Sequence, residues 1–245
     1  MERVAVVTGA ARGIGESIAR VLAGHGWRIV VCDVNREGAE AVAAEIDGSA
    51  ESFDLTDLGA VAEAAARIVE RTGGVDALVN NAGWERIAPF ADTDADLWRK
   101  VIEINLLGPI ALTHALLPSL SERAGRIVNI SSDAGRTGSK GEVPYSAAKG
   151  GILGFTRALA REAAAHKVTV NAVCPGPTNT PLNREVAESN PKLMAAIKRA
   201  IPLARAYDAI GEPDDIAHAV AYLLSPQARW VTGQTLSVNG GLLIA

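Results

Sequence analysis

Cysteine and histidine are scarce in this sequence. Only two cysteines, Cys32 and Cys174, occur in 245 residues, each inside an apolar run, and the four histidines are scattered. Two separated thiols of this kind are typical of buried, reduced cysteines in a cytoplasmic protein, not of a disulfide framework. The sequence has no CxxC or HExxH spacing, so no metal site is expected.

An excess of positive charge is also missing. The formal net charge is −4 and the isoelectric point is near 5.6, which argues against a nucleic-acid partner. Met1 is followed at once by Glu2 and Arg3, so no signal peptide is expected, and no apolar run is expected to span a bilayer. The protein is therefore expected to be cytoplasmic, without a membrane partner.

The composition is that of a folded protein with a large core. Hydrophobic residues make up 48% of the chain and charged residues 21%, which disfavours disorder. No internal repeat or linker divides the sequence. We therefore predict a single domain over residues 1–245.

Short apolar segments alternate with helical patterns along the chain. Strands are expected within 4–8, 28–33, 51–55, 75–83, 125–132, 168–176 and 234–238, and helices near 14–23, 37–46, 58–71, 94–121, around Tyr145 and near 214–224. Continuously apolar strands that alternate with helices indicate a parallel sheet covered on both faces. The expected fold is α/β, a Rossmann-type doubly wound sheet of about seven parallel strands with helices on both faces.

One long irregular segment, about 176–210, interrupts this alternation. It holds four prolines around short helical patches. Long excursions of this kind are more often functional lids than ordinary loops. We predict a mobile substrate flap here.

A glycine-rich turn, Thr8–Gly15 (TGAARGIG), follows the first expected strand and opens the first expected helix. Glycines there let the backbone approach a pyrophosphate at the helix N-terminus. The spacing G-x-x-x-G-x-G differs from the common G-x-G-x-x-G fingerprint. Taken alone, the turn is equally compatible with a nucleotide site and with tight packing.

Asp33 ends the second expected strand, where a carboxylate binds the adenosine ribose hydroxyls in dinucleotide sites. A carboxylate there repels the 2′-phosphate of NADP, so NAD is the predicted cofactor. Arg12 in the glycine turn argues the other way, because a guanidinium binds phosphate. Asp33 as a simple strand-end cap is the remaining alternative. Asp54-Leu55 and the segment 80–83 (NNAG) follow the next two strands at the same edge of the sheet.

Tyr145 and Lys149 are four residues apart on one expected helix face, separated only by small residues. An isolated pair of this spacing is usually a solvated surface pair. Here Ser131 and Ser132 close the preceding strand, and no G-x-S-x-G elbow accompanies them. The serines are therefore interpreted as hydrogen-bond donors to a substrate oxygen. Tyr145 is interpreted as an acid–base group whose pKa is lowered by the Lys149 cation and a nicotinamide cation.

Several motifs follow one another along nearly the whole chain: TGAARGIG, NNAG, Asn105, Ser132, YSAAK, Pro175-Gly176 and the terminal VTGQTLSVNGG. Together they resemble the short-chain dehydrogenase/reductase family. The resemblance implies a catalytic tetrad of Asn105, Ser132, Tyr145 and Lys149, and a homotetramer. In that scheme Tyr145 exchanges a proton with the substrate, Ser132 holds the same oxygen, Lys149 binds the nicotinamide ribose and Asn105 holds a water. The predicted cofactor-binding residues are Gly9, Arg12, Gly13, Ile14, Gly15, Asp33, Asp54, Leu55, Asn81, Ala82, Gly83, Tyr145, Lys149, Pro175, Gly176, Thr178 and Thr180.

Two branches of that family are most similar, and both act on β-hydroxyacyl or β-ketoacyl thioesters. The frame resembles 3-oxoacyl-[acyl-carrier-protein] reductases, whereas NNAGW, SDAGRTGSKGE and NAVCPGPTNTPL resemble 2-hydroxycyclohexanecarboxyl-CoA dehydrogenases, which Asp33 also favours. Oxidation of a sugar, polyol or steroid is an alternative. A non-catalytic NAD(H)-binding protein is disfavoured because no tetrad position is broken. For each predicted substrate-pocket residue, packing is at least as good an explanation as substrate contact; these residues are Trp84, Asp133, Glu142, Pro177 and Leu182.

Overall fold

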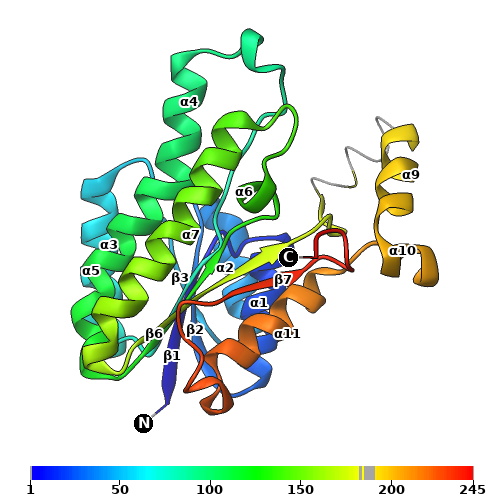
Figure 1. Cartoon of the computed structure of the whole chain (residues 1–245). Helices are drawn as coiled ribbons and strands as arrows, with labels where there is room; N and C mark the ends of the chain where they lie inside the picture. The colour runs from blue at the N-terminus through cyan, green and yellow to red at the C-terminus, as the bar shows by residue number, and fades with distance from the viewer. Residues whose placement is uncertain (1, 182–183, 185–190, 245) are drawn as a thin grey trace.

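A seven-stranded parallel sheet forms the centre of the protein (Figure 1). The structure is a computed structural model that describes residues 2–181, 184 and 191–244. The strand order is β3-β2-β1-β4-β5-β6-β7, so the predicted doubly wound sheet is confirmed. The strands are β1 Arg3–Thr8, β2 Trp27–Cys32, β3 Ser49–Glu51, β4 Ala77–Asn80, β5 Arg126–Ile130, β6 Thr169–Pro175 and β7 Thr235–Val238.

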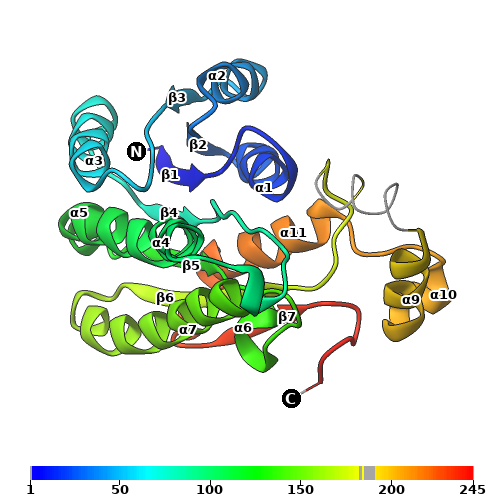
Figure 2. The same cartoon turned by 90° about the horizontal axis from the view of Figure 1, so that it is seen from above.

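Helices cover both faces of the sheet (Figure 2). They are α1 Gly13–Gly24, α2 Arg36–Glu45, α3 Leu58–Thr72, α4 Ala95–Ile102, α5 Gly108–Glu122, α6 Ala134–Thr137, α7 Val143–Ala163, α9 Pro191–Ala200, α10 Pro202–Tyr207 and α11 Pro213–Leu224. One core cluster joins α1, α2 and α11 to the sheet, and a second joins α3, α5 and α7 to it. Alternate strand residues supply the two clusters, as the two-residue period of a strand requires: Val7 faces the first and Val6 the second.

The third strand lies earlier than predicted. The expected range was 51–55, but β3 pairs with β2 only as far as Glu51, opposite Cys32. The chain then turns, because the Asp54 carboxylate accepts a hydrogen bond from Thr56 N, and Leu55 is buried beneath the helices. An edge strand has only one neighbour to hold it, so the local turn ends it early.

The long helical region predicted over 94–121 contains a π-helical stretch, Glu103–Leu107, between α4 and α5. By length and composition alone, the whole helical run Ala95–Glu122 could cross a membrane. This contradicts the expectation from the sequence that no apolar run is suited to span a bilayer. The run packs against α3 and α7, and 39% of its most apolar window is buried. A core helix of a globular protein passes the same test, so this is weak support for a membrane span.

The predicted flap, 176–210, contains α9 and α10 in its described part. Both helices stand apart from the two helical layers, beyond the carboxyl edge of the sheet (Figure 1). Thr178 pairs with Gly211 in an isolated bridge, which joins the start of this segment to the chain just before α11. The mobility of the flap stays a prediction.

Candidate active site

The glycine turn after β1 has no room for side chains at two positions. A Cβ added at Gly9 would lie 2.7 Å from the Ala82 Cα, and one added at Gly15 would lie 2.1 Å from the Gly9 carbonyl oxygen. Gly9 and Gly13 also have positive φ angles of 63° and 64°. At these two positions the absent side chains let the backbone of the turn pack closely on itself and on Ala82, which is the packing alternative raised from the sequence. A pyrophosphate at the N-terminus of α1 stays a prediction.

The NNAG segment after β4 holds this turn in place. The backbone N–H groups of Asn81 and Ala82 both donate to the Thr8 hydroxyl, at 3.0 and 3.1 Å. The Asn81 amide donates to the carbonyl oxygens of Thr8 and Gly9 at 2.9 and 3.1 Å. Asn81 therefore shapes the predicted cofactor site through the backbone of the glycine turn.

The Asp33 carboxylate lies between β2 and the glycine turn. One oxygen accepts from Ala11 N at 3.0 Å and the other from Asn35 N at 2.9 Å. Asp33 is thus a strand-end cap, the alternative raised from the sequence, and the same contacts fix its carboxylate at the edge where an adenosine ribose would bind. Arg12 is exposed on the same turn.

The remaining predicted cofactor residues differ in their surroundings. Thr180 lies next to the glycine turn, because a Cβ added at Gly13 would be 3.8 Å from its methyl group. Thr178 is buried, and its hydroxyl donates to the Gly176 carbonyl oxygen at 2.9 Å. Ile14 packs against the core, Leu55 is buried and Asp54 is exposed. Leu182 lies outside the described residues.

Tyr145 and Lys149 do lie on one face of α7. The Lys149 Nζ is 5.5 Å from the centre of the Tyr145 ring and donates to the Ile130 carbonyl oxygen at 2.9 Å. Lys149 is only 3% exposed, so this is not a solvated surface pair. On the other side, the Ser132 hydroxyl hydrogen-bonds Tyr145, and the Ser131 hydroxyl donates to the Lys149 carbonyl oxygen at 2.8 Å.

Asn105 lies in the π-helical stretch and is fully buried. Its amide nitrogen donates to the carbonyl oxygens of Trp84 and Val101, at 2.7 and 2.9 Å, and its oxygen accepts from Trp84 N at 3.3 Å. A Cβ added at Gly83 would lie 2.9 Å from that oxygen and 3.4 Å from the Lys149 Nζ. The π-turn therefore places Asn105 beside Lys149, a common use of such turns at functional sites.

In the chain by itself, the surroundings of Tyr145 raise its pKa, and the lowering of that pKa by Lys149 together with a nicotinamide cation stays a prediction. Burial raises the Tyr145 pKa, Glu85 and Glu142 raise it further, and the hydrogen bond from Ser132 lowers it. Burial lowers the pKa of Lys149 to about 8, against the effect of Glu85. The phenol is consequently protonated at neutral pH in the chain by itself.

Sequence reasoning missed Glu85. Burial, and next the Glu142 charge, raise the Glu85 pKa to about 7, while Lys149 lowers it. The only signal in the sequence was a charged residue directly after NNAGW. Glu142, predicted as a pocket residue, also has a raised pKa because of burial.

Two further pocket candidates have structural partners. The Asp133 carboxylate accepts from the Asn239 amide at 2.6 Å and from the Ser237 hydroxyl at 3.4 Å, which ties it to the C-terminal segment within and after β7. Trp84 packs in a small cluster with Leu97 and Tyr145, and the Lys100 Nζ lies 4.2 Å from its ring centre. A substrate role for Asp133, Trp84 and the half-buried Pro177 stays a prediction.

Helix α6 approaches α7 at Gly135, where a Cβ would lie 2.6 Å from the Lys149 carbonyl carbon. We expect Gly135→Ala to displace this part of α7 and to lower the free energy of unfolding by about 1–3 kcal/mol, with a loss of activity. Gly154→Ala is the matched control in α7, because an added Cβ meets nothing within 4 Å there. It should be neutral or stabilise the helix by up to about 1 kcal/mol in urea unfolding. Equal effects of the two variants would contradict this account.

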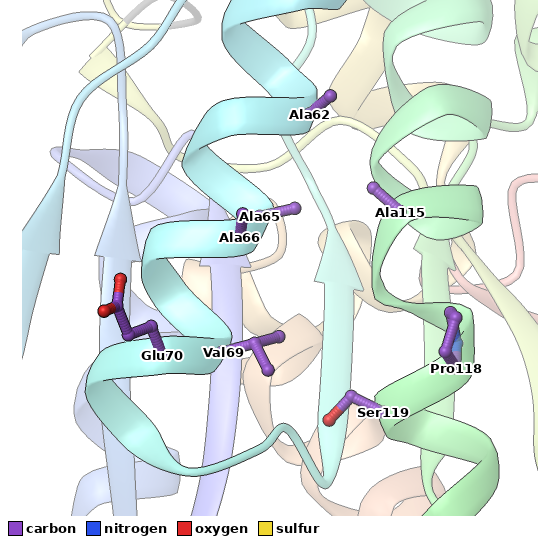
Figure 3. Close-up of a pocket in the computed structure, with 8 residues that line it drawn as sticks. All are labelled: Ala62, Ala65, Ala66, Val69, Glu70, Ala115, Pro118 and Ser119. Carbon is purple, nitrogen blue, oxygen red and sulfur yellow. The ribbon is translucent and has the colours of Figure 1, made fainter.

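A separate hollow of about 420 Å³ lies between α3 and α5, away from the tetrad (Figure 3). Its lining residues are Ala62, Ala65, Ala66, Val69, Glu70, Ala115, Pro118 and Ser119. None of them is a predicted site residue, and an alanine-rich wall offers no acid–base pair, so the chemistry is assigned to the sheet edge. Across residues 2–181, 184 and 191–244, no group of three or more potential ligands is placed to hold a metal ion.

Known proteins resemble this chain over nearly its whole length. A family model described as enoyl-(acyl carrier protein) reductase matches residues 9–243. Acetoacetyl-CoA reductase of Shinella zoogloeoides is 42% identical over 98% of this chain and 98% of its own. The 3-oxoacyl-[acyl-carrier-protein] reductase FabG of Vibrio cholerae is 37% identical over 98% of this chain and 97% of its own.

Solved structures share the fold. A single-residue variant of the actinorhodin polyketide ketoreductase, solved with NADPH, has a TM-score of 0.91 and 38% identity, covering 98% of this chain and 97% of its own. A crystal structure named ribose-5-phosphate isomerase from Brucella melitensis 16M has a TM-score of 0.92 and 35% identity, covering 99% and 93%. Because the same fold carries both names, the reaction has to be argued from the site residues.

Proposed function

The chain belongs to the short-chain dehydrogenase/reductase family, and on this premise we propose that it interconverts β-ketoacyl and β-hydroxyacyl thioesters with NAD(H). The observation that carries the proposal is the buried Lys149 behind Tyr145, with Ser132 hydrogen-bonded to the phenol. The names of the relatives favour a linear β-ketoacyl thioester over the cyclic 2-hydroxycyclohexanecarboxyl-CoA type that the loop sequences resemble.

When bound, the nicotinamide supplies or takes up the hydride; the residues of the chain handle the proton. Tyr145, protonated at neutral pH because burial and two glutamates raise its pKa, gives its proton to the carbonyl oxygen in the reductive direction. The Ser132 hydroxyl hydrogen-bonds the same oxygen. The Lys149 ammonium, 5.5 Å from the ring centre, stabilises the phenolate that results. Asn105 fixes the backbone at Trp84 beside them.

A substrate panel tests this proposal. The change in NADH absorbance is followed for each compound of the panel, with NADH supplied for a ketone and NAD for an alcohol. The panel contains acetoacetyl-CoA, 2-oxocyclohexanecarboxyl-CoA, a sugar, a polyol and a steroid ketone. We expect turnover to be highest with acetoacetyl-CoA. Preferred turnover of the sugar, polyol or steroid would replace the thioester assignment while leaving the family unchanged.

The proposed cofactor is NAD, and Asp33 supports it. Its carboxylate is fixed by two backbone N–H groups at the ribose end of the site, and a 2′-phosphate there would meet a like charge. We expect Asp33→Ala to raise the KM for NADH and to lower the NADH-to-NADPH ratio of kcat/KM by at least about tenfold. The exposed Asp96→Ala is the matched control. A wild type that already prefers NADPH would contradict the assignment of Asp33.

We also propose a cytoplasmic homotetramer. Trp230 is 90% exposed and Ile244 87% exposed in the single chain, and we expect a further copy to cover them. Both cysteines are free and buried, in keeping with a reducing compartment. Light scattering of the purified protein should give four times the mass of one chain; a monomer would contradict the proposal. Cell fractionation tests the compartment.

A further inference from the structure

The side chain that follows Ser132 is tied to the far end of the chain. Asp133 is only 9% exposed. One of its carboxylate oxygens accepts from the Asn239 amide at 2.6 Å, and the other accepts from the Ser237 hydroxyl at 3.4 Å. The shorter contact is the stronger of the two, and among the described residues Asn239 is the only donor to that oxygen. Asn239 is therefore the main anchor of the Asp133 carboxylate.

The backbone of Asp133 forms the turn that holds the Ser132 hydroxyl. Asp133 separates Ser132 from Ala134, whose N–H donates to that hydroxyl at 3.1 Å. The Asp133 carbonyl oxygen accepts from Arg136 N at 2.9 Å and from Thr137 N at 3.1 Å, at the start of α6. Because the hydroxyl accepts from Ala134, its own hydrogen is left for a substrate oxygen or for the phenol beside it. A shift of Asp133 would displace the donor that orients the hydroxyl.

Asn239 is itself held on its other sides. Its amide nitrogen also donates to the Leu243 carbonyl oxygen at 3.1 Å, and its amide oxygen accepts from Gly241 N at 3.0 Å. A Cβ added at Gly176 would lie 2.8 Å from the Asn239 Cα, so Asn239 packs directly on the loop after β6. The amide is thus a fixed partner for Asp133 and not a free surface group.

The turn after Asn239 rests on the flap helix α10. The Gly240 carbonyl oxygen accepts from Leu203 N at 3.0 Å. A Cβ added at Gly240 would lie 2.7 Å from the Ile201 Cγ2, and one added at Gly241 would lie 3.2 Å from the Pro202 Cγ. The C-terminal segment 239–243 therefore lies between the flap and the turn that follows Ser132.

We propose that Asn239 is a positioning residue for the reaction: through Asp133 it holds the Ser132 hydroxyl where the substrate carbonyl oxygen binds. A hydrogen-bond donor contributes most to a reaction when it is already oriented toward the atom on which charge develops. The role of Asn239 is to maintain that orientation from outside the group of reacting atoms. The inference rests on the proposed function, because that function makes Ser132 the donor to the substrate oxygen.

Asn239→Leu tests the inference, because leucine has a similar size but donates no hydrogen bond. With the ketone that the substrate panel turns over fastest, we expect kcat to fall at least about tenfold. In a Ser132→Ala background, where no hydroxyl is left to orient, the same substitution should change kcat by less than about twofold. An equal loss in both backgrounds would show a merely structural role and overturn the inference, as would no loss in the wild-type background.

Gln227→Leu is the matched control. It removes an amide from an exposed position near the C-terminal end of α11, far along the chain from Asp133, and it should leave kcat unchanged in both backgrounds.

Substitutions of Asp133 test the route from Asn239 to Ser132, and they keep the inference testable if Asn239→Leu does not fold. Asp133→Asn retains an oxygen that can accept from Asn239, whereas Asp133→Leu does not. We expect Asp133→Asn to keep at least about fivefold more kcat than Asp133→Leu. Asp133→Leu combined with Asn239→Leu should lose no more kcat than the worse single variant. Additive losses, or equal kcat in the two Asp133 variants, would overturn the route.

Crystal structures separate this inference from the proposed function. The distance from the Ser132 Oγ to Ala134 N is 3.1 Å in the wild type. It should exceed about 3.5 Å, beyond hydrogen-bond range, in Asn239→Leu, and stay unchanged in Gln227→Leu. If no ketone is turned over, a displaced hydroxyl still supports the positioning role, and only the proposed reaction fails. An unmoved hydroxyl in Asn239→Leu overturns the inference, whatever the activity.

Discussion

Tyr145→Phe is expected to lower kcat for acetoacetyl-CoA reduction by about 10²–10⁴-fold, the usual contribution of a positioned acid–base group. The substitution removes only the hydroxyl group, which Ser132 hydrogen-bonds and which lies on the same helix face as the buried Lys149. The ring still packs with Leu97 and Trp84, so the fold should be retained. Steady-state kinetics with NADH measures the effect.

Tyr222→Phe is the matched control for this variant, because Tyr222 is 48% exposed on α11. Its kcat should equal that of the wild type, and circular dichroism should show both variants folded. If Tyr145→Phe kept kcat within a few-fold of the wild-type value, the proton would have to come from another group and the mechanism would be wrong.

Lys149→Met is expected to lower kcat at least about 10²-fold and to raise the free energy of unfolding at pH 7 by about 1–3 kcal/mol. The activity falls because no cation remains to stabilise the Tyr145 phenolate. The stability rises because burial lowers the Lys149 pKa from 10.5 to about 8, so holding the ammonium inside the protein at pH 7 costs free energy. The lost hydrogen bond to Ile130 offsets part of this gain.

The Lys149 pKa also determines how the difference in unfolding free energy between Lys149→Met and the wild type depends on pH. Above about pH 8 the folded wild type loses the Lys149 proton, while the unfolded chain keeps it up to about pH 10.5. The unfolded state then binds more protons, so wild-type stability rises with pH in this window and the advantage of Lys149→Met shrinks. Urea unfolding from pH 7 to 10.5 measures this. The exposed Lys140→Met is the control. A constant difference across the window would contradict the burial of a charged Lys149.

Much of the fold could be predicted from local sequence because the strands are short apolar runs between helical patterns. The third strand was misplaced because an edge strand of three residues gives way there to a turn at Asp54. The apolar helix Ala95–Glu122 was misjudged too, because its charges cluster near its first turns and leave a long apolar remainder. The first misjudgement concerns what the strand packs against, whereas the second concerns only the length and composition of the helix.

The tetrad was predictable because its spacing is local, but the electrostatics were not. Tyr145 and Lys149 share a helix face, and Ser132 follows the strand that precedes that helix. The glutamates that raise the Tyr145 pKa come from loops whose approach depends on the contact of Ala88 with Gly141, far apart in the chain. The Asp133–Asn239 contact spans 106 residues. No periodicity in the sequence encodes contacts of that range.

The transfer of deuterium from NADH that carries deuterium at both C4 positions to acetoacetyl-CoA, read by mass spectrometry of the 3-hydroxybutyryl-CoA product, tests the proposed reaction most directly. For the wild type we predict one deuterium on the carbon that bore the ketone, and for Tyr145→Phe product formation reduced by about 10²–10⁴-fold. Unlabelled product, no product from the wild type, or equal product formation by Tyr145→Phe would contradict the proposed reaction.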